Sequence, residues 1–418
     1  MPFPRIAAAC ALLAACALTL ATARADNWPA WRGPTGQGFS AEKNLPTKWS
    51  ATENVKWKVA LPDAGNSTPV VWGDKIFLTQ ATEKGKKRSL LCLNRKDGST
   101  VWEKTVAFDG KEVIHGTNTY CAASPVTDGE RVVAFHGSAG MYCYDFAGKE
   151  LWKKEFGPCD HIWGSAASPV IYKDLVIHNF GPHAKVFLVA LKKTDGTEVW
   201  RNDEQKASDY IGSWSTPVVA KAGDRTELVM SWPAQVKSYE PETGKPLWSC
   251  KGLEKEGGGD RLTYASALVS DKYVFAAAGY GGAAIGVKTG GTGDVTETHR
   301  LWRAAKNPQR IGSGVIVGDH AYVVNEPGVV CIDLKTGKQA WDKPITGGAW
   351  GSIVHADGKL YLTSQRGETL VFAAKPDEYE EIAANKLDGS TTRASIVPSD
   401  GELFIRTYQH LWCIAAKK

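Results

Sequence analysis

The sequence predicts an all-β protein, an eight-bladed β-propeller built from four-stranded antiparallel blades. Three observations along its 418 residues predict this fold class: a hairpin pattern returns along nearly the whole chain, most copies end in a tryptophan, and the two chain ends carry complementary parts of one blade. Because a lone hairpin is not stable in water, copies at a regular spacing must pack on one another. A closed ring leaves no copy without a neighbour.

The clearest copy of the hairpin is LLCLNRKDGSTVW, from Leu90 to Trp102. An apolar strand leads into a polar turn, a glycine supplies the positive φ of that turn, and a second strand ends in an indole. A small residue stands ten positions before the tryptophan, and a glycine four before it, in the copies that end at Trp102, Trp200, Trp248 and Trp341; the copy that ends at Trp152 is one residue shorter. We expect the small residue to admit the indole of the neighbouring blade. The tryptophans assigned to this contact are Trp57, Trp102, Trp152, Trp200, Trp248, Trp302 and Trp341.

The number of blades follows from the innermost strands, which are apolar and rich in small residues. These strands are expected to begin near Ser67, Ala122, Ala166, Thr216, Ser266, Gly314, Ile353 and Ser395. Two copies depart from the pattern. In the fifth, sixteen residues separate Gly286 from Trp302, and in the seventh the segment EYEEIAANKL, from Glu378, replaces the tryptophan copy.

The two ends of the chain are predicted to share one blade. The segment ENVKWKVALP, from Glu53 to Pro62, has the pattern of an outer strand with no blade before it, and the segment from Thr391 supplies three strands and then stops. Pairing the strand of Trp57 with residues 411–415 would close the ring and remove both free sheet edges.

The spacing of small residue, glycine and tryptophan resembles the tryptophan-docking motif of the quinoprotein (PQQ) dehydrogenase-like β-propeller repeat family, over about residues 55 to 418. That family contains dehydrogenases that use pyrroloquinoline quinone (PQQ), and a non-catalytic branch that includes the lipoprotein of the outer-membrane assembly machinery. The resemblance implies the fold; it does not by itself imply the chemistry, because one fold hosts unrelated functions.

Charge and motifs exclude several function classes. The net charge is +5, and the longest basic stretch is the short segment from Lys84 to Arg88, so nucleic acid is not expected as a partner. No GxxxxGK[ST] loop occurs, so nucleotide hydrolysis has no support.

We divide the chain into a signal peptide (residues 1–25), an N-terminal extension packed on the propeller (26–50) and the propeller itself (51–418). An uncharged apolar run follows Arg5 and ends at Ala23-Arg24-Ala25, which predicts export with cleavage after Ala25, to the periplasm or cell envelope, and no transmembrane span after processing. The alternative is a lipid anchor at Cys16, since Leu13-Ala14-Ala15-Cys16 matches a lipobox. The extension is expected to decorate the surface, with Trp28, Trp31 and Trp49 tucked against it.

One mouth of the central channel is the candidate site, because the loops between consecutive blades gather there. The candidate ligand or partner residues are Asn118, Tyr120, His161, Trp163, Trp214, Tyr264, Arg310, Glu326, Trp350, Arg366 and Arg393. Such a set could hold a planar anionic ligand, with arginines on its carboxylates and Trp232 or Trp350 stacked on its plane. The plainer alternative is that these residues close the mouth over water.

The function expected is therefore that of an exported, non-catalytic binding or scaffolding module, whose partner is a protein or an envelope polymer. The alternative is a PQQ-dependent oxidoreductase of alcohols or sugars. Such an enzyme needs a Ca²⁺ held by oxygen ligands and an aspartate that acts as general base. The family's enzymes typically clamp the cofactor with two adjacent cysteines, and this sequence has no such pair. We assign no catalytic residue, metal site or cofactor.

Seven cysteines follow the leader. Cys92, Cys143, Cys331 and Cys413 occupy the small position of the hairpins and are expected to be buried thiols. The others are Cys121, Cys159 and Cys250, of which Cys121 and Cys159 could form a disulfide in an exported protein, a pairing that the sequence leaves open.

Overall fold

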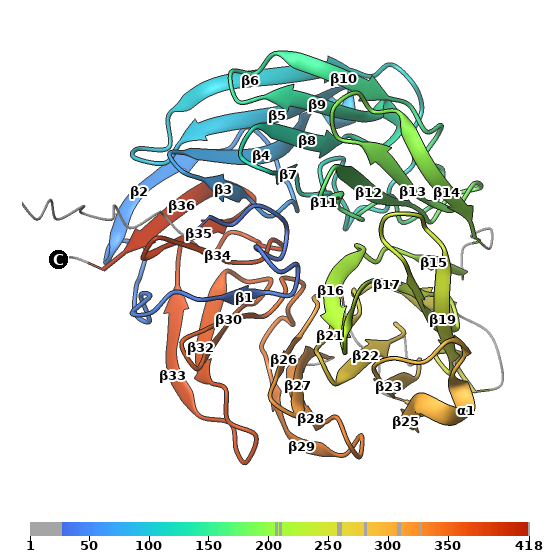
Figure 1. Ribbon diagram of the computed structural model, residues 1–418. Coiled ribbons are helices and arrows are strands. Elements are labelled where there is room, and N and C mark those ends of the chain that lie inside the picture. The colour runs from blue at the N-terminus through green and yellow to red at the C-terminus, as the bar shows by residue number, and fades with distance from the viewer. Residues whose placement is uncertain are drawn as a thin grey trace, which may run out of the picture.

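The computed structural model shows eight blades, each built on four antiparallel strands, arranged in a ring (Figure 1). It describes residues 27–204, 208, 211–256, 261–279, 282–306, 311–325 and 328–416. The prediction of an all-β, eight-bladed propeller is confirmed. Each blade has four strands, of which the first lies at the channel and the fourth at the rim.

The first four blades are contiguous in sequence. Blade 1 consists of β3 (Val70–Trp72), β4 (Lys75–Thr82), β5 (Lys87–Asn94) and β6 (Thr100–Ala107), and blade 2 of β7 (Val126–Thr127), β8 (Arg131–Phe135), β9 (Met141–Asp145) and β10 (Glu150–Lys154). Blade 3 consists of β11 (Val170–Tyr172), β12 (Leu175–Phe180), β13 (Phe187–Lys192) and β14 (Glu198–Asp203). Blade 4 consists of β16 (Val218–Ala222), β17 (Arg225–Trp232), β18 (Gln235–Tyr239) and β19 (Pro246–Lys251). Two 3₁₀ turns lie inside blades 1 and 2, at Glu83–Gly85 and Gly137–Ala139.

The next three blades follow the same order, and the eighth borrows its outer strand from the start of the chain. Blade 5 consists of β21 (Leu268–Val269), β22 (Tyr273–Ala277), β23 (Ala284–Lys288) and β25 (Arg300–Ala304), and blade 6 of β26 (Val315–Val317), β27 (His320–Val324), β28 (Gly328–Asp333) and β29 (Gln339–Pro344). Blade 7 consists of β30 (Val354–Ala356), β31 (Lys359–Thr363), β32 (Glu368–Ala373) and β33 (Glu381–Lys386). Blade 8 consists of β34 (Val397–Ser399), β35 (Glu402–Arg406), β36 (His410–Ala415) and β2 (Val55–Ala60). Strands β15 (Ile211–Ser213) and β20 (Arg261–Thr263) form a separate parallel pair.

The tryptophans join consecutive blades, but most of the indoles meet the turn glycine of the next blade rather than the small residue that we expected them to meet. The small residue stands opposite the tryptophan of its own blade, as Cys92 does with Trp102. The neighbour's indole instead lies on the turn glycine: a Cβ on Gly98 would come within 2.9 Å of the Trp57 ring. The indole N–H of Trp57 donates to Arg95 O at 2.9 Å. Five further tryptophans, Trp102, Trp152, Trp200, Trp302 and Trp341, donate to a carbonyl of the following blade in the same way.

Trp248 is the exception among the seven. Its indole donates at 2.7 Å to Glu227 Oε2, a fully buried carboxylate of its own blade. The long turn of the fifth repeat explains the difference. Its residues form β24 (Gly293–Asp294), which pairs in parallel with β19, and the single turn α1 (Thr296–His299). This turn therefore covers the outer edge of blade 4.

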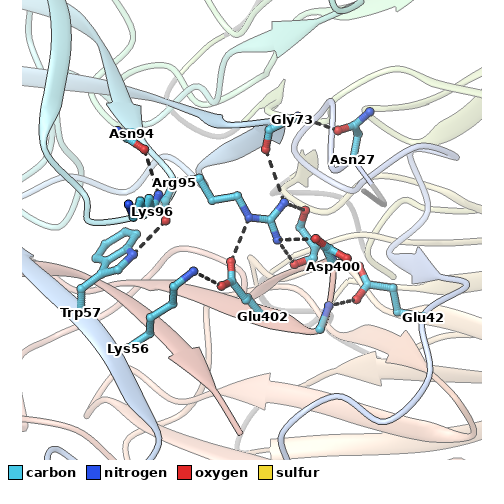
Figure 2. Close-up of polar contacts among 12 residues, drawn as sticks. Asn27, Glu42, Lys56, Trp57, Gly73, Asn94, Arg95, Lys96, Asp400 and Glu402 are labelled. Carbon is cyan, nitrogen blue, oxygen red and sulfur yellow. Dashed lines mark hydrogen bonds and ion pairs between the residues drawn. The ribbon is translucent and has the colours of Figure 1, made fainter. Parts of the chain in front are cut away.

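The ring closes by pairing of the two chain ends, as the split blade predicts. Strand β2 pairs antiparallel with β36, with Trp57 opposite Cys413. Figure 2 shows a polar network at this seam: Arg95 from blade 1 contacts Glu402 of blade 8, and Glu402 also contacts Lys56 of β2. The two ends of the chain are thus held together by backbone pairing and by side-chain contacts.

A closed belt of hydroxyl groups surrounds the channel. Two residues before each innermost strand stands a serine or threonine whose side-chain oxygen accepts the backbone N–H of its counterpart in the preceding blade, at 2.8 to 3.0 Å. The members of this hydroxyl belt are Thr68, Ser124, Ser168, Thr216, Ser266, Ser313, Ser352 and Ser395. Eight bonds return to their starting point, so each blade is fixed to both neighbours at the axis.

The N-terminal extension packs on the propeller with buried side chains and makes contacts beyond its outer surface. It crosses the channel end opposite the candidate mouth, since it meets the innermost strands near their far ends. Trp28 bridges to Val71 of blade 1, and Gln37 Oε1 accepts the N–H of Val269 in blade 5. Strand β1 (Phe39–Ser40) then adds in parallel to β30 of blade 7. We call residues 27–50 the crossing segment.

Large side chains of the crossing segment are buried in the propeller. Trp28, Arg32 and Trp49 are 1%, 2% and 4% exposed. Arg32 donates to Gly314 O of blade 6, and Glu42 accepts the N–H groups of Asp400 and Gly401 in blade 8. Within the described residues, no helix has the length and apolar character needed to cross a membrane.

Candidate functional site

A cavity lies at the mouth of the channel, where the loops between consecutive blades converge. It has a volume of about 320 Å³. Aromatic rings dominate its wall, and all eight interblade loops contribute residues to it. The lining residues are Trp31, Asn66, His115, Thr117, Asn118, Ala122, Trp163, Ala166, Ser168, Trp214, Thr216, Tyr264, Ile311, Trp350, Arg393 and Ser395.

The floor of the cavity is formed by the hydroxyl belt and by the crossing segment. Ser168, Thr216 and Ser395 of the belt and the indole of Trp31 line it. Trp31 reaches the cavity because its neighbours Trp28 and Arg32 fix the segment across the channel. The cavity is therefore a cup with one open mouth, rather than a pore.

Arg393 supplies the positive charge of the cavity wall. Its guanidinium lies 4.1 Å from the ring centroid of Trp350 and 5.6 Å from that of Tyr408. It donates to Thr117 O and, from Nε at 3.2 Å, to Gln365 Oε1. Partial burial holds the pKa of Arg393 below its usual value. No carboxylate of the described chain forms an ion pair with it, and no described lining residue is acidic.

Two more buried guanidinium groups near the channel also lack an acidic partner within the described residues. Arg406 donates to Ser67, Thr79 and Gln80, and Arg32 to backbone carbonyls. Burial lowers the pKa of Arg32 to about 9 and lowers that of Arg406 as well. Among the described residues, these groups and Arg393 are positive charges of the channel without an acidic partner, which favours anions.

The amides of the mouth are already used within the protein. Asn118 Nδ2 donates to Trp163 O at 2.8 Å and Ser165 O at 3.1 Å, and its Oδ1 accepts from Asn66 Nδ2. The hydroxyl of Tyr408 donates to Asn66 Oδ1 at 3.2 Å. These bonds tie the loops of blades 8, 1, 2 and 3 together, so the two asparagines hold the rim in shape.

The loop 108–125, between blades 1 and 2, forms part of the rim. The ring of His115 lies 4.4 Å from that of Trp163, centroid to centroid. A buried ion pair anchors the loop, because Glu112 contacts Arg88 Nη1 at 2.8 Å with both side chains at most 3% exposed. Tyr120 lies against the same Arg88, at 5.1 Å.

The structure brings six of the eleven predicted mouth residues together around the cavity: Asn118, Trp163, Trp214, Tyr264, Trp350 and Arg393. Arg310 and Glu326 lie outside the described residues. The remaining three, Tyr120, His161 and Arg366, are placed elsewhere by their own contacts.

Those three residues pack beside the cavity rather than in its wall. Tyr120 covers Arg88, as described above. His161 is buried, donates from Nε2 to Ser208 O at 2.8 Å and packs edge-on against Trp214. The side chain of Arg366 lies against Gly347, where a Cβ would approach it to 2.9 Å. Trp232, proposed as a stacking platform, is 2% exposed and donates to Tyr239 Oη, so it belongs to the core.

Sequence reasoning missed Trp31, His115, Thr117 and Ile311. Trp31 lies in a segment without a repeat period, and no local pattern shows that it crosses the channel. The hydroxyl belt, in contrast, carried a signal: a serine or threonine precedes every innermost strand by two positions.

Histidines and cysteines do not form a reactive cluster in the described chain. No group of three or more histidine, cysteine or acidic side chains there could hold a metal ion. The seven described cysteines are buried thiols, so Cys121 and Cys159 are not joined in this structure. Burial lowers the pKa of His136 and of His178 to about 3. It lowers that of His183 to about 4.

Comparison with known proteins gives a family and a fold. Residues 35–174, 117–343 and 184–418 match a family model described as "Outer membrane protein assembly factor BamB". No protein in a search of curated sequences matches the chain.

Solved structures from two functional groups resemble it. BamB from Moraxella catarrhalis aligns with a TM-score of 0.61 at 16% identity, over 85% of this chain and 98% of its own. A europium-containing methanol dehydrogenase aligns with a TM-score of 0.66 at 11% identity, over 93% and 98%. A quinohemoprotein alcohol dehydrogenase from Comamonas testosteroni gives 0.64 at 12%, over 94% and 81%. At these identities the likeness establishes the fold alone.

Proposed function

The chain belongs to the family of PQQ-like β-propellers described by the outer membrane protein assembly factor BamB, and from this membership we propose that it is an exported, non-catalytic binding module of the cell envelope. Its partner is a protein, and the partner docks on the open mouth. The leader-like residues 1–25 support export, to the periplasm or the outer membrane.

The observation that carries this proposal is the asymmetry of the two channel ends. The crossing segment seals one end with buried contacts, whereas the other end presents loops and a cup lined by aromatic rings. Aromatic side chains are enriched at the centres of protein interfaces. Two of the exposed large apolar side chains, Val113 and Ile162, lie on contacting loops of the open mouth.

A PQQ-dependent oxidoreductase is the second candidate, because dehydrogenases share the fold. The described cavity does not fit that cofactor with its ion. PQQ carries three carboxylates and works with a cation such as Ca²⁺, which prefers several oxygen ligands that include carboxylates. The described wall offers one guanidinium and no acid, its two asparagine amides are engaged, and the described cysteines include no adjacent pair. We therefore derive no redox step for this chain.

Site-specific photocrosslinking in intact cells tests the proposal. A photoreactive amino acid is placed at Val113 or Ile162 of the mouth, and at Val199 or Leu301 of the outer strands as matched controls; these side chains are 42–44% exposed. We expect both mouth positions to yield the same protein adduct, and the two positions on the outer strands not to yield it. An adduct common to all four positions, or none at the mouth, would refute docking there.

A titration of the purified protein with PQQ and Ca²⁺ tests the second candidate. Stoichiometric uptake together with reduction of a dye by an alcohol or a sugar would establish the oxidoreductase and replace our proposal. We expect neither.

A further inference from the structure

The aromatic cup has a wall chemistry that selects its ligand. Four indoles, from Trp31, Trp163, Trp214 and Trp350, and the phenol ring of Tyr264 offer flat apolar faces. Flat faces of this kind favour a planar apolar body, because rings gain contact area by stacking. The volume of about 320 Å³ is at the lower end for ligand cavities and suits a small molecule or a single side chain.

The polar groups that remain available in the described wall are hydrogen-bond donors. The amides of Asn66 and Asn118 are engaged with each other, with carbonyls and with Tyr408. The oxygens of the hydroxyl belt accept backbone N–H groups. Arg393 retains donor capacity, since a guanidinium has five N–H groups and two contacts are made here, to Thr117 and Gln365. Trp350 Nε1 is a buried donor without a hydrogen-bond partner in the described chain.

Charge points in the same direction as hydrogen bonding. Arg393 sits half-buried on Trp350, and Arg32 and Arg406 lie buried near the channel, without a carboxylate partner within the described residues. A half-buried cation without a counter-ion attracts an anion, and it does so more strongly where the walls exclude water. A cationic ligand would be repelled.

From these observations we propose that the cup binds an organic monocarboxylate with a planar apolar body, whose carboxylate pairs with Arg393 and whose ring stacks among the indoles. This inference rests on the proposed function in one respect, the use of the open mouth as the binding face. The described part of the wall holds one cation, Arg393, which matches one carboxylate. The cup is therefore distinct in chemistry from a site for a tricarboxylate quinone with a metal ion.

Calorimetric titration with three probes of similar shape tests the ligand class: 2-naphthoate, 2-naphthamide and 2-naphthylmethylammonium. We expect the acid to bind at least about tenfold more tightly than the amide, as one charge-assisted hydrogen bond gives, and the ammonium not to bind. Equal affinities for acid and amide, or no binding of the acid at millimolar concentration, would overturn the proposal.

Variants locate the charge. Arg393→Gln should abolish the preference for the acid over the amide, while Arg366→Gln, a mouth arginine outside the cup, should keep it. Arg393→Lys should retain part of the preference, because the charge stays while the stacking changes; this second variant serves if the first does not fold. A preference that survives in Arg393→Gln would refute the assignment.

The experiment separates this inference from the proposed function. Loss of naphthoate binding with intact crosslinks at Val113 and Ile162 would leave the protein partner standing and remove the carboxylate. Intact naphthoate binding with no crosslinks would support the carboxylate site and refute docking of a protein partner at the mouth.

Discussion

The side chains of Arg95 and Glu402 form an ion pair across the seam between the first blade and the last, with Nε and Oε2 2.8 Å apart (Figure 2). Arg95 also donates to Ser399, and its backbone carbonyl accepts the indole N–H of Trp57. One residue thus contacts both chain ends that make the closing blade. The two charged side chains are 10% and 12% exposed, so solvent screens their attraction only in part.

We expect Glu402→Gln to lower the free energy of unfolding by about 1 to 3 kcal/mol, because Arg95 then stays largely buried with only the more distant Asp400, at 4.0 Å, as its counter-charge. Urea denaturation followed by tryptophan fluorescence measures this. The matched control is Glu198→Gln, which breaks the Arg201 pair on the outside of blade 3, where both side chains are about one-third exposed; its cost should stay below about 1 kcal/mol. Equal losses would show that the seam pair has no special role.

The hydroxyl belt gives a second prediction. Ser266→Ala removes the acceptor of the Thr216 N–H and the donor to the Thr216 carbonyl, both buried, so it should cost about 1 to 3 kcal/mol. Ser231→Ala is the matched control, because that buried hydroxyl has no partner among the described residues, and its removal should be neutral or stabilising. Denaturation midpoints decide, and a larger loss at Ser231 would contradict the belt.

Trp248 should respond to loss of its N–H more strongly than Trp102. Trp248→Phe deprives the fully buried Glu227 carboxylate of a donor at 2.7 Å, and should lower the free energy of unfolding by about 1 to 3 kcal/mol in addition to the effect of the smaller ring. Trp102→Phe removes a hydrogen bond to the Phe146 carbonyl at a half-buried site, and the corresponding loss should be about 0.5 to 1.5 kcal/mol. The same denaturation experiment compares them, and the reverse order would mean that Glu227 is not held by the indole.

Three buried histidines predict acid sensitivity. The pKa values of His136 and His178, about 3, and of His183, about 4, lie below the unfolded value of about 6.5, so the folded state favours neutral rings. Their contribution to stability is complete above about pH 6.5, and it is lost as the pH falls from there, since the unfolded chain takes up protons that the folded chain does not. Each histidine adds a slope of about 1.4 kcal/mol per pH unit. Stability measured between pH 7.5 and 5 should fall accordingly, and His178→Gln should make the slope shallower. An unchanged slope in that variant would contradict the burial of a neutral ring.

The crossing segment gives the last prediction. Deletion of residues 27–50 removes Trp28, Arg32 and Trp49 from buried positions, and should cost about 5 kcal/mol or more, since loss of one large core side chain already costs about 3 to 5. Deletion through Pro62 should in addition expose the edge of β36 and promote aggregation. Thermal unfolding and light scattering of both truncations check this. A shorter truncation that melts like the full chain would show that the segment only decorates the propeller.

The propeller was predictable because its signals are local and repeated. Each hairpin carries its own turn glycine and indole, and the same spacing from Cys92 to Trp102 and from Cys331 to Trp341 imposes the same geometry on blades far apart in sequence. The mouth was predictable in part for the same reason: the loop before each innermost strand falls at one end of any such ring, which placed Trp163, Trp214 and Arg393 correctly.

The remaining site residues depend on contacts that no period encodes. Trp31 enters the cup because Trp28 and Gln37, on either side of it, bond to blades on opposite sides of the ring. Tyr120 leaves the cup because Arg88, a residue of the preceding blade, offers its guanidinium as a packing partner. Both outcomes are decided between segments whose sequences do not resemble each other.

The shared blade also sets the order in which the molecule can be completed during synthesis. Strand β2 leaves the ribosome early, but its partner β36 follows the strands of the other seven blades, so the early strand must wait unpaired until those strands have emerged. Seven blades can assemble while their ring is still open, with the hydroxyl belt interrupted between Ser352 and Thr68. A circular permutant cut between β33 and β34, with the natural ends linked, would bring the four strands of the closing blade into one stretch of sequence, with the N-terminal residues between β36 and β2. It would thereby shorten the sequence separation of the most distant pairing of the fold.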